Sequence, residues 1–251
     1  MTLQLQNKFN VVVVGVGGIG SYLSEIMVRS FSPIINKIDL VDKDVIEYKN
    51  LFRQPFGVKD IGKSKTAAVA ERLKIFGLSA EINPLNEWFT YDTFREKMEK
   101  TLPQQYPTFI LVGVDNHTAR LEVLKVVDAT KNTYCIIGAN STDSSNTYFY
   151  SKTLCNTRYD PRVRFPNMFD FDYDNPMSGC TAVSTVKSFP QTTLANFNAA
   201  ADIATLFRVY TQNFEFIKSC DSSIIPYELV VHSVGKETQY YEKNFKLVEN
   251  D

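Results

Sequence analysis

The chain has 251 residues, 44% of them hydrophobic, which is enough to bury the core of one large α/β domain. A formal net charge of −1 gives no support for a nucleic-acid or membrane-surface partner. No apolar run approaches the roughly 20 residues that cross a bilayer, and residues 1–9 lack the apolar centre of a signal peptide, so we expect a cytoplasmic protein.

Alternating strand and helix patterns run from the start of the chain to about residue 140. The predicted strands are residues 10–14, 37–42, 80–85, 109–114 and 134–139. The predicted helices are residues 18–31, 64–76, 91–102 and 117–129. This strict β-α order predicts a Rossmann-like, doubly wound, mostly parallel sheet.

Beyond residue 140 the pattern changes. Residues 146–153 alternate and predict an antiparallel strand, and residues 156–179 form a long loop-like stretch. A helix is predicted over residues 192–213, followed by antiparallel hairpin strands at 227–233 and 238–241. We therefore expect one domain over 1–251, with a nucleotide-binding core at 10–140 and the crossover loop, long helix and hairpin at 141–251.

A glycine-rich turn follows the first predicted strand and opens the first helix. Its glycines are Gly15, Gly17, Gly18 and Gly20. Glycines let the backbone approach a phosphate closely, and a helix N-terminus presents unpaired N–H groups to it. Asp42 ends the next strand, where a carboxylate can bind ribose hydroxyls. The segment therefore predicts a nucleotide site; the alternative is a tight turn without a ligand.

Cationic residues after the second strand favour a triphosphate over a dinucleotide. Arg53 can bind phosphate oxygens with two parallel hydrogen bonds, and Lys65 adds a point charge near a predicted helix N-terminus. A dinucleotide site requires neither residue. The alternative interpretation is a solvated basic loop.

Asp115 ends the fourth parallel strand, where ligands of open α/β sheets lie. Its carboxylate could hold Mg²⁺ against the phosphates, or it could cap the helix that begins at His117. Arg120, one turn into that helix, could orient Asp115 or pair with it. His117 itself is interpreted as a local hydrogen-bonding residue rather than a catalyst.

The cysteines and histidines offer little metal chemistry. The four cysteines are widely spaced and form no C-x-x-C pair: Cys135, Cys155, Cys180 and Cys220. The spacing argues against the usual four-cysteine zinc site. Cys180 follows the long loop, and one interpretation is a half-buried structural cysteine.

Taken together, these segments resemble the ThiF/MoeB/E1 superfamily of ATP-dependent enzymes that activate ubiquitin-like and sulfur-carrier proteins. The matching motifs are Gly15-Val16-Gly17-Gly18-Ile19-Gly20, Val41-Asp42-Lys43-Asp44, Asn50-Leu51-Phe52-Arg53-Gln54, Gly62-Lys63-Ser64-Lys65 and Val114-Asp115-Asn116 with Arg120. The resemblance is strong over residues 10–140 and weaker beyond. The C-terminal part of the chain is similar to the PRTRC-system ThiF branch.

The resemblance implies a role for each matched residue. It places Asp42 on the ribose, the phosphates on Asn50, Arg53 and Lys65, and Mg²⁺ near Asp115. The same motifs add three nucleotide-binding residues: Asp44, Gln54 and Asn116. The implied reaction is adenylation of a carrier protein's C-terminal carboxylate by ATP, with Arg53, Lys65 and Asp115 as catalytic residues and Cys180 as acceptor. A homodimer is also implied.

Two departures from the family pattern keep other functions open. Paired zinc cysteines are missing, and residues 1–9 offer only Lys8 where many members place an arginine that reaches the partner subunit's site. Arg158, Arg162 or Arg164 could substitute for it. The alternatives are a non-catalytic ATP-binding adaptor, or an enzyme whose acceptor is a peptide or a tRNA base.

Overall fold

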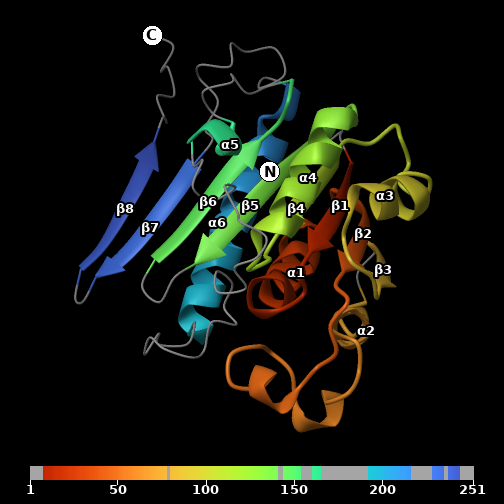
Figure 1. Ribbon diagram of the computed structural model, residues 1–251, viewed down its shortest axis with the longest axis vertical. Helices are drawn as coiled ribbons and strands as arrows, with labels where there is room; N and C mark the ends of the chain where they lie inside the picture. Colours follow the sequence, from red (N-terminus) through yellow and green to blue (C-terminus); the bar gives the residue numbers. More distant parts are fainter. Residues whose placement is uncertain are drawn as a thin grey trace.

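A single twisted sheet forms the centre of the molecule in the computed structural model (Figure 1). The structure describes residues 8–77, 80–140, 144–153, 160–164, 192–215, 228–234 and 237–243. Its strands are β1 (Phe9–Val14), β2 (Ile35–Val41), β3 (Glu81–Leu85), β4 (Thr108–Val112), β5 (Thr133–Asn140), β6 (Ser144–Tyr150), β7 (Glu228–Val234) and β8 (Glu237–Lys243). Its α-helices are α1 (Gly18–Phe31), α2 (Lys65–Lys74), α3 (Tyr91–Thr93), α4 (His117–Ala129), α5 (Pro161–Arg164) and α6 (Thr193–Gln212).

The eight described strands lie in the order β3-β2-β1-β4-β5-β6-β7-β8. Strands β1 to β5 are parallel, and β6 to β8 are antiparallel to their neighbours. The order reverses between β1 and β4, which makes the carboxyl ends of these two strands the topological switch point where ligands of such sheets bind. The predicted fold class, including the antiparallel C-terminal hairpin, is confirmed.

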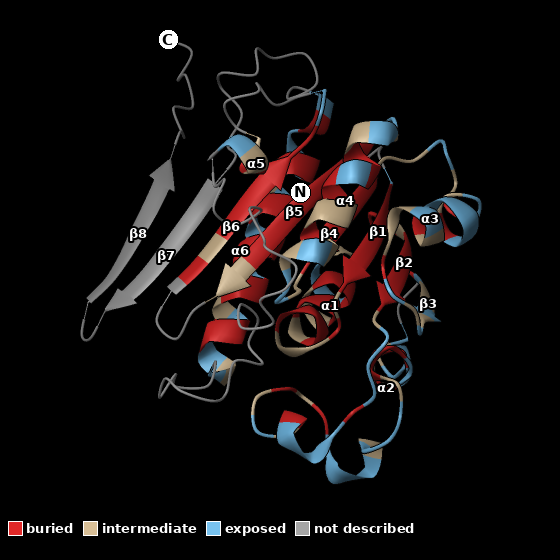
Figure 2. Ribbon diagram, viewed as in Figure 1, coloured by how far each residue is buried: buried red, intermediate tan, exposed pale blue. Residues whose placement is uncertain are grey.

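Alternating side chains of the parallel strands fill two hydrophobic cores, one on each face of the sheet. On one face Val11 and Val13 pack with α1, α2 and α6; on the other, Val12 and Val14 pack with α4 and the region after α3. Figure 2 shows these central strands buried throughout. A sheet covered on both faces explains why its strands read as unbroken apolar runs.

Several predicted element boundaries differ from the structure by a few residues. The helix predicted over residues 91–102 is only α3 followed by a π-helical turn, Phe94–Met98, in which the amide of Glu99 donates to the Phe94 carbonyl. The strand predicted over residues 109–114 ends at Val112, although the Gly113 amide still donates to the Val14 carbonyl of β1. The predicted long loop contains α5 among its described residues.

Arg162 lies at the end of the sheet opposite the switch point. Its guanidinium donates to Asp128, Asp160 and the Tyr150 hydroxyl, and Tyr150 pairs with Cys135 near the start of β5. Within this chain Arg162 is therefore remote from the carboxyl ends of the parallel strands. Among the helices of the described residues, none combines the length and the hydropathy that a bilayer crossing needs.

Asp202 is a buried carboxyl group in the middle of α6, accepting a hydrogen bond from the Ser145 hydroxyl of β6. Burial raises its pKa from 3.8 to about 6. The folded state therefore holds this proton more tightly than the unfolded chain does. The stability that this proton contributes is complete below pH 4 and is lost as the pH rises through about 6.

Asp202→Asn should consequently be more stable than the wild type at pH 7.5, by up to about 3 kcal/mol, and lose that advantage near pH 4. Urea unfolding at both pH values measures this difference, and the exposed Asp92→Asn serves as control. An advantage that does not change with pH would contradict the assignment.

Candidate functional site

The glycine turn between β1 and α1 is shaped by close backbone approaches. Gly15 adopts a φ of +83°, and a Cβ added there would lie 2.6 Å from a Val114 methyl carbon. A Cβ added to Gly20 would overlap the carbonyl oxygen of Gly15, and one added to Gly18 would overlap the amide of Asn196. The turn therefore requires glycine at these positions, and it leaves the first turn of α1 open to a ligand.

A cavity of about 860 Å³ lies at the carboxyl ends of the parallel strands, beside this turn. That volume is ample for a nucleotide-sized ligand. The cavity is lined by most of the predicted site residues: Gly15, Gly17, Gly18, Asp42, Asp44, Asn50, Arg53, Gln54, Lys65, Asp115 and Asn116. Gly20 lies behind the turn rather than on the cavity wall, and Cys180 falls outside the described residues.

Asp42 ties the end of β2 to the glycine turn. One carboxylate oxygen accepts from the Val16 amide at 2.7 Å, and the other accepts from the Asp44 amide at 2.8 Å. Burial raises the pKa of Asp42, and the nearby Lys65 charge partly offsets that rise. The carboxylate is thus fixed at the cavity wall with lone pairs left for further donors.

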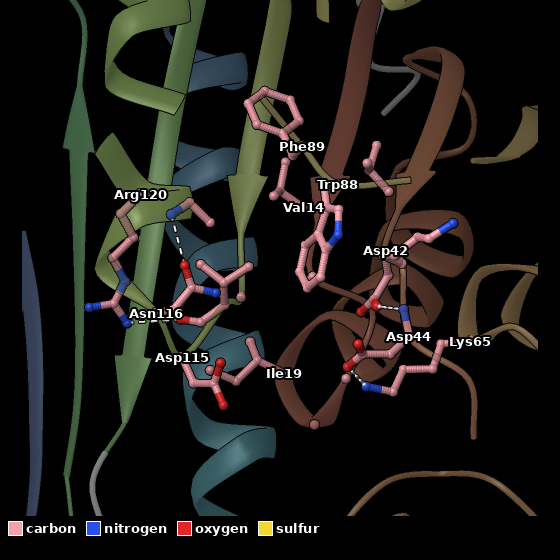
Figure 3. Close-up of a pocket in the computed structure, with 18 of the residues that line it drawn as sticks. Val14, Ile19, Asp42, Asp44, Lys65, Trp88, Phe89, Asp115, Asn116 and Arg120 are labelled. Atoms are coloured by element: carbon pink, nitrogen blue, oxygen red, sulfur yellow. Dashed lines mark hydrogen bonds and ion pairs between the residues drawn. The ribbon is translucent and has the colours of Figure 1, made fainter. Parts of the chain in front are cut away.

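Lys65 is buried at the N-terminus of α2 and pairs with a carboxylate from the loop after β2. Its ammonium donates to Asp44 at 2.6 Å (Figure 3). Lys65 is 6% exposed, whereas Asp44 is exposed. The ion pair with Asp44 holds the ammonium in position at the cavity. A polyphosphate that enters the cavity would compete with Asp44 for this ammonium.

The loop that carries Arg53 and Gln54 is fixed from two helices. Asn196 of α6 donates its side-chain amide to the Arg53 carbonyl at 3.1 Å, and Arg72 of α2 donates to the Pro55 carbonyl at 2.5 Å. The Gln54 amide nitrogen would lie 3.6 Å from a Cβ added to Gly17. Gln54 is 7% exposed, and among the described residues its carbonyl oxygen has no hydrogen-bond partner.

Asn50 stabilises the start of the same loop. Its side-chain oxygen accepts from the Glu47 amide at 2.8 Å within the 3-10 turn Tyr48–Asn50. Asn50 is 4% exposed. The fixed orientation places this side chain on the cavity wall without a large change of conformation on ligand binding.

Of the two roles predicted for Asp115, the helix cap belongs instead to Asn116, whose side chain accepts from the Ala119 amide at 2.8 Å. The prediction that Arg120 orients Asp115 or pairs with it is wrong. Arg120 donates to the Val114 carbonyl at 2.9 Å and contacts the His117 ring at 3.3 Å. Burial, followed by the Arg120 charge, lowers the pKa of His117, which keeps the imidazole neutral near pH 7.

Asp115 is an exposed carboxylate on the cavity wall that makes no hydrogen bond or ion pair to another described residue. Among the described residues no three acidic, histidine or cysteine side chains cluster as metal ligands. Mg²⁺ bound to nucleotide phosphates needs only one or two carboxylates, with water and phosphate oxygens completing the shell. The single free carboxylate of Asp115 fits that requirement.

Several cavity residues were missed by the sequence predictions, among them two aromatic and two asparagine side chains. Trp88 and Phe89 follow β3, Asn140 ends β5, and Asn196 lies in α6. Asn140 donates to Asn196 at 2.9 Å, which links the sheet edge to α6. None belongs to a glycine or charge motif, and the only sequence signal was the single tryptophan of the chain, which follows shortly after the end of a strand.

The fold and the cavity define a Rossmann-like α/β protein whose site lies under a glycine turn at the switch point of the sheet. The chain belongs to the ThiF family, whose sequence model matches residues 2–222. The resemblance to the ThiF/MoeB/E1-like adenylyltransferases is therefore confirmed, and the PRTRC branch stays a prediction.

Known relatives differ in what they act on. The chain is 25% identical to the tRNA threonylcarbamoyladenosine dehydratase of Haemophilus influenzae, over 73% of this chain and 71% of that protein. It is 33% identical to ubiquitin-like modifier-activating enzyme 5 of Dictyostelium discoideum, over 46% of this chain but only 31% of that protein. A structure of Escherichia coli MccB with ATP superposes with a TM-score of 0.60 and 20% identity, covering 95% of this chain and 65% of MccB.

Proposed function

We propose that this protein is an ATP-dependent adenylyltransferase that activates the C-terminal carboxylate of a small ubiquitin-like or sulfur-carrier protein. The observation that supports it best is the meeting of the glycine turn, Asp42, Arg53 and Lys65 around one cavity. Polyphosphate recognition needs this combination of open backbone N–H groups and cations. The ATP named with the MccB structure and the carrier-activating relatives are in keeping with the proposal.

In this reaction a carboxylate oxygen attacks the α-phosphorus of ATP, the bond to the bridging oxygen breaks, and pyrophosphate leaves. Arg53 and Lys65 would bind the phosphate oxygens and offset the charge that develops on them. Asp42 would hold the ribose. Mg²⁺, when bound through Asp115, would add further charge neutralisation. Catalysis is then mainly a matter of positioning, since an ionised carboxylate needs no general base to attack phosphorus.

The acyl-adenylate can then pass its acyl group to a thiol, with release of AMP. Cys180 remains the predicted acceptor in this chain. It lies 12 residues before Thr192, the residue that caps α6. The side chain of Thr193 in turn reaches the Phe52 carbonyl at 3.5 Å, next to Arg53. The start of α6 therefore lies beside Phe52, the neighbour in sequence of the cavity residue Arg53, which makes Cys180 worth testing as the acceptor.

The test is ATP–pyrophosphate exchange with labelled pyrophosphate and the purified protein. We expect labelled ATP to form only when a small protein or peptide with a free C-terminal carboxylate is present. If the protein binds ATP but shows no exchange with any carrier tested, the proposal would be replaced by that of an ATP-binding adaptor. A second arm supplies bulk tRNA, because the Haemophilus influenzae relative acts on tRNA. Exchange with tRNA alone would reassign the acceptor.

A further inference from the structure

Trp88 is a large aromatic side chain left exposed on a fixed segment of backbone. Its exposed fraction is 63%, while the adjacent Phe89 is 6% exposed. The Thr93 hydroxyl donates to the Trp88 carbonyl at 3.0 Å, and Glu87 pairs with Lys97 at 2.5 Å. The segment is thus held at both sides of the indole. The fixed backbone therefore presents an apolar ring that a ligand could cover with little loss of conformational freedom.

The indole of Trp88 faces the nucleotide cavity rather than open surface. It is among the lining residues, and in the view of Figure 3 its ring lies between Val14 and Asp42. Apolar side chains of Val14, Val41 and Phe89 line the same cavity. Together with the indole, these side chains offer an apolar surface, which suits an aromatic ring better than a phosphate.

Three features stand in sequence along the carboxyl edge of the sheet. The glycine turn follows β1, Asp42 follows β2, and Trp88 follows β3, the next strand outward. The Asp42 amide donates to the Leu85 carbonyl at 3.2 Å, which fixes the ends of β2 and β3 together. A nucleotide with its phosphates at the glycine turn and its ribose at Asp42 would extend its base toward Trp88.

We propose that Trp88 forms one wall of a base-binding subsite, in which its indole stacks on the purine ring of the nucleotide. This inference rests on the proposed function, because it assumes that the cavity takes a nucleoside triphosphate. Stacking of a base on an aromatic side chain is tolerant of base identity, and it grows with ring area. Trp88 would therefore favour purine over pyrimidine nucleotides and would not itself separate ATP from GTP.

Trp88 is the only tryptophan in the chain, so the wild-type protein carries its own reporter. We expect ATP to quench the tryptophan fluorescence of the wild type. Inorganic tripolyphosphate, which lacks a base, should displace ATP without quenching. Trp88→Ala should weaken ATP binding about tenfold by calorimetry, and Trp88→Phe should restore most of the affinity. The affinity for tripolyphosphate should be the same in all three proteins.

Ile75→Ala, on the exposed face beyond α2, serves as control for removal of an exposed apolar side chain, and it should leave both affinities unchanged. ATP binding that leaves the emission unchanged, or a Trp88→Ala variant that binds ATP as tightly as the wild type, would overturn the subsite while the proposed function stands. A wild type that binds tripolyphosphate but no nucleotide would overturn both.

Discussion

Replacing Arg53 with alanine is expected to lower carrier-dependent ATP–pyrophosphate exchange by about a hundredfold or more. Arg53 lines the cavity from the loop beside the glycine turn, and its removal would take a cation away from the negative charge that develops on the phosphates. The loop itself should keep its conformation, because Asn196 binds the Arg53 backbone carbonyl rather than the side chain. Initial exchange rates at saturating ATP, with a melting curve for each protein, measure the effect.

The matched control for Arg53 is Arg95→Ala. Arg95 is exposed, pairs with Glu99 at 2.7 Å and does not line the cavity. Exchange by this variant should stay within about twofold of the wild type, because exposed ion pairs contribute little. If Arg53→Ala retained wild-type exchange as well, phosphate binding by that side chain would be ruled out.

A Gly20→Ala substitution is expected to destabilise the protein by about 3 kcal/mol, which for a chain of this size lowers the melting temperature by roughly 10 °C. Alanine would otherwise favour the helix interior. At this position, however, its Cβ would overlap the Gly15 carbonyl oxygen, a backbone atom whose residue is fixed at a φ of +83°. Relief of the overlap must shift the glycine turn, so nucleotide affinity should fall with stability.

Gly57→Ala provides the contrast. A Cβ there meets nothing closer than Asp60 at 3.7 Å, and its φ of −105° suits any residue. Its stability and nucleotide binding should match those of the wild type or improve slightly. Chemical denaturation and calorimetry of the two variants side by side decide the matter. Equal stability of Gly20→Ala and Gly57→Ala would show that the turn does not make the close approach described.

The sequence predicted much of the site because its motifs are short and local. The glycine turn, Asp42 and the Arg53 loop each follow a strand end, and parallel strands bring their carboxyl ends to one edge. The sequence did not show which of two adjacent residues caps the N-terminus of α4. Asp115 and Asn116 are adjacent and can both cap a helix, and only backbone geometry gave that bond to Asn116.

The sequence by itself determined the order and type of the elements through β5, since buried parallel strands and amphipathic helices carry strong periodic patterns. Tertiary structure decided the contacts between distant segments. Asn196 reaches the Arg53 carbonyl across 143 positions of sequence, and Lys65 pairs with Asp44 rather than standing alone. The indole of Trp88 became a cavity wall only because β3 pairs with β2. Local sequence patterns indicate which face of an element is buried, whereas contacts between residues far apart in the sequence depend on how whole elements pack.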